Sequence, residues 1–198
     1  MVIGERFAWC HMQKTGGDAT LQLFQLFPGL LVHADARNMQ AKHTPFAERE
    51  HEAQGKLLAC NLRRLPAWLL SWDQHASQHR VVRPDGTPVL MSSPQQVAER
   101  ARGDRRLAHF TDGGRYRIDR WLRMEQLGRD FTSFISEFTD VTEDERHAIA
   151  GNTPVNVLDY DHELEHWFTP AQVRLMYSNN PVWASLEERL YGDLVLLD

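Results

Sequence analysis

Apolar residues in the first part of the chain gather in short runs that alternate with amphipathic stretches. Residues 6–12 and 56–62 are short, rich in apolar side chains and followed by loop signals, which is typical of buried strands. Residues 18–27 and 66–79 place apolar side chains near helical spacing, and Pro66 suits a first helical turn, where no N–H donor is needed. The pattern predicts strand, loop and helix twice in succession.

The second half of the chain is predicted to be mainly helical. Residues 81–94 contain three prolines and a turn signal, which indicates an excursion or a small hairpin. Ser93 is a suitable N-cap for a charged helix that runs to Arg102. A further strand is expected within residues 116–124, and helices are expected from Glu125 onward.

Strands that alternate with helices predict the α/β class, with a mostly parallel central sheet and helices on both faces. The 198 residues are enough for one compact domain. We therefore expect a single three-layer domain over residues 1–198, with a core at 6–130 and a helical portion at 131–198. Ligands in such folds bind beyond the carboxyl ends of the strands.

Composition narrows the classes of function. The formal net charge of -5 argues against non-specific nucleic-acid binding, which depends on many lysines and arginines. No apolar run approaches the length of a membrane span or of a secretion signal, so neither is expected. Cys10 and Cys60 are too few for a disulfide framework, which favours a reducing, cytoplasmic setting. Any bound anion would have to be held by a local cluster.

Such a cluster is expected where the first strand passes into the first helix, in the segment His11-Met-Gln-Lys-Thr-Gly-Gly17. A glycine-containing loop that opens a helix directs backbone N–H groups and the positive end of the helix dipole at one point. Lys14 adds a full positive charge, and Thr15 and Thr20 add hydroxyl groups. These residue types predict phosphate or sulfate binding. The lysine precedes the glycines, unlike the ATPase loop, so ATP hydrolysis is not expected.

The same segment resembles the His-x-Pro-Lys-Thr-Gly-Gly loop of sulfotransferases that use 3′-phosphoadenosine 5′-phosphosulfate (PAPS), a family with a P-loop-NTPase-like fold. In that family the loop binds the 5′-phosphosulfate group. Gln13 replaces the usual proline, and Asp18 and Ala19 replace the usual hydroxyl residues, so Thr20 is the substitute hydroxyl. The resemblance implies a 5′-phosphosulfate site made of Lys14, Thr15, Gly16, Gly17, Asp18, Ala19 and Thr20.

A second part of the family pattern is an arginine followed eight residues later by a serine, and both bind the 3′-phosphate. Arg63 and Ser71 have this spacing. A planar guanidinium is suited to bidentate phosphate contact. Pro66 lies one residue later than in the usual form, so Arg64 is an alternative to Arg63.

The family resemblance also indicates a catalytic base. Lys42-His43-Thr44-Pro45 is similar to the Lys-Thr-His-x-Pro segment that carries the base in many cytosolic sulfotransferases. A histidine with a pKa near neutrality can take the proton of an attacking hydroxyl group. His43 is therefore the expected base. The alternatives are His11, His33, Glu48 and Glu52.

A weaker match covers Arg123 to Asp130, which looks like the Arg-x-Glu-x-Leu-x-x-Asp segment of the family. Together the matches imply an enzyme that transfers a sulfuryl group from PAPS to a hydroxyl or amine by in-line displacement. His43 would deprotonate the acceptor, and Lys14 would stabilise the leaving oxygen. The expected acceptor is a small molecule, carbohydrate or lipid, and no metal is required.

Two other functions compete with this interpretation. His162, Glu163 and His166 fit the zinc-protease pattern His-Glu-x-x-His, which needs a helix to place both imidazoles on one face. Asp161 and Glu165 beside these histidines instead favour a solvated surface. The other alternative is a sulfotransferase-like protein that binds nucleotide without catalysis, since Asp18 would repel a dianionic donor.

Overall fold

The computed structural model of this chain has two compact units, formed by Met1–Arg63 with Leu107–Asn156 and by Arg64–Arg106 with Val157–Asp198. It describes residues 1–36, 40–79, 91–153 and 157–198. These residues form a five-stranded mixed sheet and nine α-helices, which confirms the α/β class. This division into units does not test the prediction of a single domain, which stays a prediction.

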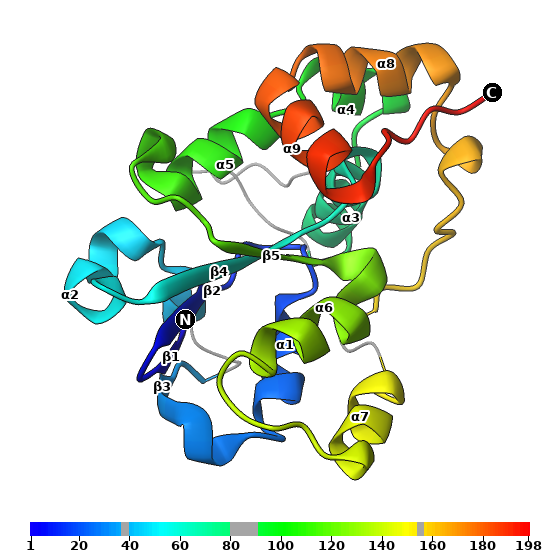
Figure 1. The fold of residues 1–198 in the computed structure, drawn as a ribbon. Coiled ribbons are helices and arrows are strands. Elements are labelled where there is room, and N and C mark those ends of the chain that lie inside the picture. The colour runs from blue at the N-terminus through cyan, green and yellow to red at the C-terminus, as the bar shows by residue number, and fades with distance from the viewer. Residues whose placement is uncertain (37–39, 80–90, 154–156) are drawn as a thin grey trace. The chain divides into compact units, whose positions relative to one another are not determined.

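The sheet lies in the first unit and has the order β3-β1-β2-β4-β5 (Figure 1). Its strands are β1 (Val2–Gly4), β2 (Phe7–Cys10), β3 (Leu31–Ala34), β4 (Leu57–Leu62) and β5 (Arg120–Arg123). β2 pairs with β4 and β4 with β5 in parallel, whereas β1 is antiparallel to both β2 and β3. Hence β3, β2, β4 and β5 all run in one direction.

The predicted strands at 6–12, 56–62 and 116–124 are confirmed as β2, β4 and β5, each in shorter form. The last strand begins late because Asp119 closes the start of the β4–β5 pairing. Its N–H donates to the Leu58 carbonyl at 2.9 Å, and its carboxylate accepts from the Leu58 N–H at 2.9 Å. The sequence patterns did not predict β1 or β3.

One face of the sheet is covered by helices of the same unit. Figure 1 shows α1 (Gly17–Phe24) beside α6 (Leu127–Ile135). Their buried side chains share a hydrophobic core with β2, in which Phe24 contacts Phe7, Trp9 and Phe131. α1 ends at Phe24, three residues earlier than its pattern indicates, and α6 lies in the part predicted to be helical. This packing fixes the direction of α1 and so of its N-terminus.

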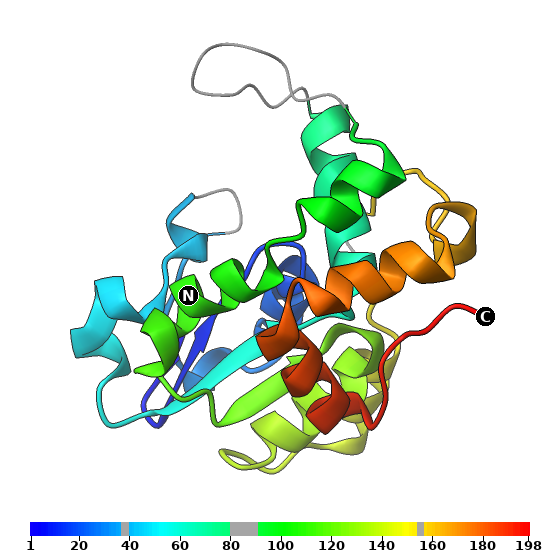
Figure 2. The same cartoon turned by 90° about the horizontal axis from the view of Figure 1, so that it is seen from above.

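The regular elements of the second unit are all helices within its described residues. Figure 2 shows α8 (Pro170–Ser178) leading at an angle into α9 (Pro181–Tyr191), which it contacts. α8 also packs against α3 (Leu65–Gln78) and α4 (Pro94–Glu99). Trp68 of α3 packs on Trp183 of α9 with ring centroids 4.8 Å apart. The predicted cap of α4 is confirmed, because the Ser93 hydroxyl accepts from the Gln96 N–H at 3.3 Å.

The remaining elements are short. They are the helices α2 (Glu50–Ala53), α5 (Gly103–Thr111) and α7 (Glu143–Ala150), and the 3-10 turns η1 (Pro28–Leu30), η2 (Gln40–His43), η3 (Phe46–Arg49), η4 (Asp112–Gly114), η5 (Met124–Gln126) and η6 (Leu164–His166). Among the helices of the described residues, none has the length and apolar character needed to cross a membrane. Most of the excursion predicted at 81–94 lies outside the described residues.

Candidate anion-binding site

The loop predicted to bind an anion joins β2 to α1 as expected. β2 ends at Cys10 and α1 begins at Gly17, with Gly16 as its N-cap. Gly16 has φ 85°, a left-handed conformation that glycine adopts without steric cost. Lys14 is also left-handed, with φ 65°, which is uncommon for a residue with a side chain. Two left-handed residues thus turn the chain from the strand into the helix.

Gly17 is required for a second reason, which is the close approach of a buried imidazole. A Cβ atom at position 17 would lie 2.0 Å from Cδ2 of His11. His11 is only 3% exposed, so its ring has no space into which to move. The glycine pair of the motif therefore has one member that permits the turn and one that makes room for His11.

Asn61 near the end of β4 holds the loop from the side of the sheet. Its amide nitrogen donates to the Thr15 carbonyl at 3.1 Å and to the Thr20 hydroxyl at 2.8 Å. Its amide oxygen accepts from Nε1 of Trp9 at 2.7 Å. Asn61 is fully buried, so these bonds replace the water that the amide loses on folding. The network ties the loop and the first turn of α1 to two parallel strands.

The two threonines of the predicted site lie inside the protein. Thr15 and Thr20 are both fully buried. The Thr15 hydroxyl donates to the Met12 carbonyl at 2.7 Å, and the Thr20 hydroxyl donates to the Gly16 carbonyl at 3.2 Å. In this conformation both hydroxyl groups shape the loop. The donors left for a ligand are the first-turn backbone N–H groups of α1, which have no intrahelical acceptor.

Positive charge collects at this end of α1. The pKa of Lys14 is lowered to about 8, first by burial and then by the positive charges of Arg63 and Lys42, against the opposing effect of Asp18. Like charges held together in a partly desolvated place are unfavourable unless an anion joins them. Lys14, Arg63 and Lys42 come from three different segments, so the sheet and the loop create this excess of charge.

Asp18 does not leave an uncompensated negative charge at the site. Its carboxylate pairs with the Lys42 ammonium at 2.6 Å, and both side chains are largely buried. Asp18 also lies in the first turn of α1, where a carboxylate interacts favourably with the helix dipole. The positive charge of Lys42 thus offsets the repulsion expected from Asp18. The positive charges of Lys14 and Arg63 remain in excess at the site.

His43 lies beside the loop, in η2. Its Nδ1 is 3.1 Å from the His11 carbonyl oxygen, and the two imidazole rings meet edge to face with centroids 4.4 Å apart. A carbonyl oxygen only accepts, so Nδ1 carries the proton and Nε2 keeps its lone pair. Burial lowers the pKa of His43, and the positive charge of Lys42 acts in the same direction. His43 is therefore a neutral imidazole near pH 7.

His11 belongs to the packing of the loop. Burial lowers its pKa well below the usual value, and the neighbouring charges of His43, Lys42 and Lys14 add to that effect. Its ring packs near Trp9, with centroids 5.6 Å apart. Its Nδ1 is buried and has no hydrogen-bond partner in the described part of the chain.

The other predicted bases lie in different surroundings. His33 is on β3 and pairs with Asp35 at 2.8 Å. Glu48 is exposed, and Glu52 accepts two hydrogen bonds from Arg49, each of 2.5 Å. The Arg49 contacts lower the pKa of Glu52, which makes it a weaker base.

Arg63 and Arg64 separate into different roles. Arg64 donates to Glu187 at 3.2 Å and to the Asp193 carboxylate at 2.6 Å, and its guanidinium lies 4.1 Å from the centre of the Tyr191 ring. These contacts engage Arg64 in the second unit. Arg63 ends the first of the two stretches that form the first unit, and its charge acts on Lys14. Ser71 is buried in α3 of the second unit.

The Arg123 to Asp130 segment positions the loop indirectly. Arg123 donates to Asp130 through its side chain at 2.7 Å and through its backbone N–H at 2.9 Å, which joins β5 to α6. Met124 follows immediately and packs over Gly16, with its Sδ 2.0 Å from where a Cβ would lie. This part of the resemblance thus has a structural role in supporting the turn.

The zinc-protease pattern is not on an α-helix. Glu163 has extended backbone angles, and only the 3-10 turn Leu164–His166 follows it. His166 instead bonds to the Asp161 carboxylate, and both histidines are exposed. Within residues 1–36, 40–79, 91–153 and 157–198, no group of three or more histidines, cysteines or acids is placed to hold a metal ion.

The sequence patterns did not assign two residues, Lys42 and Asn61, to the candidate site. Lys42 stands directly before the predicted base, so its position in the motif was a signal. Asn61 interrupts the apolar run Leu57-Leu-Ala-Cys-Asn-Leu62, and a polar residue inside a buried strand usually has a hydrogen-bonding role.

Comparisons with protein-family models, curated proteins and solved structures find no match to this chain.

Proposed function

We propose that this protein is a PAPS-dependent sulfotransferase with a P-loop-like donor site at the β2–α1 junction. The observation that carries the proposal is the excess positive charge of Lys14, Arg63 and Lys42 at the N-terminus of α1. The lowered pKa of Lys14, caused first by burial and then by Arg63, is the expected property of a site that is completed by an anion. The resemblance of the motifs and of their order to those of PAPS-dependent sulfotransferases supports a phosphosulfate as that anion.

In the proposed complex the first-turn amides of α1 and Lys14 hold the 5′-phosphosulfate, and Arg63 binds the 3′-phosphate. The acceptor oxygen or nitrogen attacks sulfur as the bond from sulfur to the bridging oxygen breaks. The electron pair of that bond goes to the bridging oxygen, where Lys14 stabilises the charge. The proton of the acceptor goes to Nε2 of His43.

Binding of the desulfated product, 3′-phosphoadenosine 5′-phosphate (PAP), tests the donor site. We expect calorimetry to show PAP binding that is weakened at least about tenfold by Lys14→Ala and by Arg63→Ala, since hydrogen bonds to charged groups contribute about 1.5–3 kcal/mol. Arg129→Ala, at an exposed position of α6, is the matched control and should not change the affinity. PAP that fails to bind, or binds equally well without Lys14, would exclude the proposal.

Turnover tests the base separately from binding. We expect His43→Ala to lower the rate of sulfate transfer from labelled PAPS by about 10² to 10⁴ while PAP affinity stays within about twofold. Full turnover without His43 would remove it as the base. Donor binding without transfer to any hydroxyl or amine acceptor would favour the non-catalytic alternative.

A further inference from the structure

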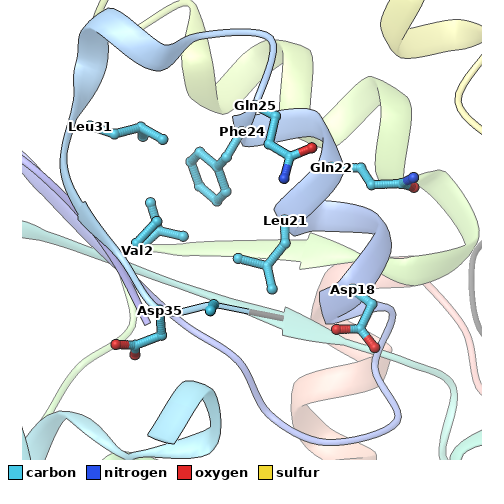
Figure 3. Close-up of a pocket in the computed structure, with 10 residues that line it drawn as sticks. Val2, Asp18, Leu21, Gln22, Phe24, Gln25, Leu31 and Asp35 are labelled. Carbon is cyan, nitrogen blue, oxygen red and sulfur yellow. The ribbon is translucent and has the colours of Figure 1, made fainter. Parts of the chain in front are cut away.

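Asp18 places a negative charge in the turn that is proposed to bind the donor. It lies in the first turn of α1 directly after Gly17, so its carboxylate belongs to the same turn as the backbone N–H groups that have no intrahelical acceptor. Asp18 also lines a cavity of about 240 Å³ between α1 and β3, at the end of α1 opposite to Gln25 (Figure 3). A carboxylate in this turn acts on any anion that binds there.

Lys42 offsets the charge of Asp18 only in part. The carboxylate and the ammonium group lie 2.6 Å apart, and the Lys42 and Asp18 side chains are 12% and 16% exposed, so salt screens the pair weakly. The remainder acts on Lys14, because Asp18 raises the pKa of Lys14 by more than Lys42 lowers it. At Lys14, which is proposed to hold the 5′-phosphosulfate, the pair therefore acts as a net negative charge.

A net negative charge at this place selects between anions by their charge. The terminal sulfate of PAPS carries a single negative charge. The terminal phosphate of 3′-phosphoadenosine 5′-diphosphate has the same shape but carries about two negative charges at pH about 7.5, because its second pKa is about 6. Repulsion grows with the product of the charges, so the diphosphate is repelled more strongly than PAPS. The 3′-phosphate is common to both nucleotides and cancels in the comparison.

We infer that Asp18 is a specificity-determining residue, which makes the donor site discriminate against a doubly charged terminal phosphate in favour of a singly charged terminal sulfate. The inference rests on the proposed function. An uncharged hydroxyl residue is usual at this position in the sulfotransferases that the motif resembles, so the selection comes from a replacement in this chain. The consequence is a site that admits phosphosulfates and disfavours nucleotides that end in a phosphate.

The test is calorimetry of the full chain with PAPS and with 3′-phosphoadenosine 5′-diphosphate, which measures the selection as a ratio of two affinities. At low ionic strength we expect Asp18→Asn to shift this ratio by at least about threefold in favour of the diphosphate, since a repelling charge is removed. Asp18→Glu keeps the charge, and the cavity gives space for the longer side chain, so the wild-type ratio should be retained. An unchanged ratio in Asp18→Asn, or a shift in favour of PAPS, would overturn the inference.

Asp144→Asn is the matched control. Asp144 is exposed in the first turn of α7 in the same unit, so this variant makes the same change of net charge at the same place in a helix. Both affinities should equal those of the wild-type protein. A shift as large as that in Asp18→Asn would assign the selection to the net charge of the protein and would contradict a specific role of Asp18.

Lys42→Gln is a second test that leaves Asp18 in place. Without the ammonium group the carboxylate is unopposed, so we expect the diphosphate to lose at least about threefold more affinity than PAPS. An equal loss for the two nucleotides would also overturn the inference, whether or not Asp18→Asn folds.

Failure of this inference and failure of the proposed function give different results. If both nucleotides bind the wild-type protein and the variants leave the ratio unchanged, Asp18 does not select the donor and the donor site stands. If neither nucleotide binds the wild-type protein, the proposed function fails and the inference fails with it. Binding of both, with ratios that shift in opposite directions in Asp18→Asn and Lys42→Gln, is the result we expect.

Discussion

Lys14 combines a left-handed backbone with an ammonium group that burial has made easier to deprotonate. Its pKa of about 8 means that the free protein loses this charge as the pH rises through that value. An anion binds the charged form, so binding must weaken on the alkaline side. The left-handed conformation, which is rare for a residue with a side chain, thus occurs at the lysine of the candidate anion site.

The first prediction concerns the pH dependence of anion binding. We expect the affinity for PAP to be constant near pH 7 and to fall by up to about tenfold per pH unit above 8, as linkage requires for one proton. Calorimetry between pH 7 and 9.5 measures this, and Lys14→Arg should give a flat profile because guanidinium stays charged. An equal alkaline loss in Lys14→Arg would assign the titration to another group.

A second prediction at the residue scale concerns Asn61. Asn61→Leu removes the partner of Trp9 Nε1, of the Thr15 carbonyl and of the Thr20 hydroxyl, all in a buried place. We expect the free energy of unfolding to fall by about 2–5 kcal/mol, measured by denaturant titration, because each orphaned group costs about 1–3 kcal/mol.

The control for Asn61 is a double-mutant cycle with Trp9→Phe. The two losses should sum to more than the loss in the double variant, because Asn61 and Trp9 share a hydrogen bond. Additive losses would mean that this hydrogen bond does not contribute to stability.

At the scale of elements, helix starts could be predicted better than short strands. Ser93 was predicted because a hydroxyl residue before a helical pattern has a defined bonding role, and it forms the expected cap. β1 has three residues and β3 has mostly exposed side chains, so neither shows a buried run or an alternation in the sequence. β1 forms through pairing with β2, and β3 forms through pairing with β1, and no local pattern contains these pairings.

The third prediction tests a helix cap in the first unit. Thr142 caps α7 through a reciprocal pair with Glu145, in which the Thr142 N–H donates to the carboxylate at 2.8 Å and the Glu145 N–H donates to the hydroxyl at 3.3 Å. We expect Thr142→Ala to lower stability by about 1 kcal/mol and Thr142→Ser to cost less. Thermal unfolding measures both. Equal losses would show that the hydroxyl group is not the source.

At the scale of the molecule, the second unit is organised around one buried acid. Glu187 is fully buried and accepts from Tyr177 at 2.7 Å, from the Leu65 N–H at 2.8 Å and from Arg64 at 3.2 Å. Burial raises the pKa of Glu187, while Tyr177, Leu65 and Arg64 favour its charged form. One side chain thus joins α9 to α8 and to the start of α3.

The fourth prediction concerns the separate stability of the units. Glu187→Leu should destabilise the second unit by about 3 kcal/mol, since a broken buried ion pair leaves its partners unsatisfied. Hydrogen exchange should become faster in α3, α8 and α9 and stay unchanged in β2 and β4, because the bonds of Glu187 lie within the second unit. Equal acceleration in both would indicate one cooperative unit.

Sequence patterns could place the candidate loop on its strand-to-helix junction because strand, glycine and helix signals are local. They could not predict the pairing of Asp18 with Lys42 or the bridge from Asn61 to Thr15, which join residues 24 and 46 positions apart. The division into units has no local signal in the sequence for a related reason. Each unit is assembled from two separate stretches of chain, and no linker marks the crossings.

The close approach of the His11 ring to position 17 has an evolutionary consequence. A side chain at position 17 requires the space that the His11 ring occupies, so the two positions cannot change independently. In a library randomised at both, alanine or serine at 17 should be recovered only with a smaller residue at 11. The histidine at the start of the motif and the glycine at its end would then be inherited as a covarying pair, six residues apart in sequence but a single packing unit.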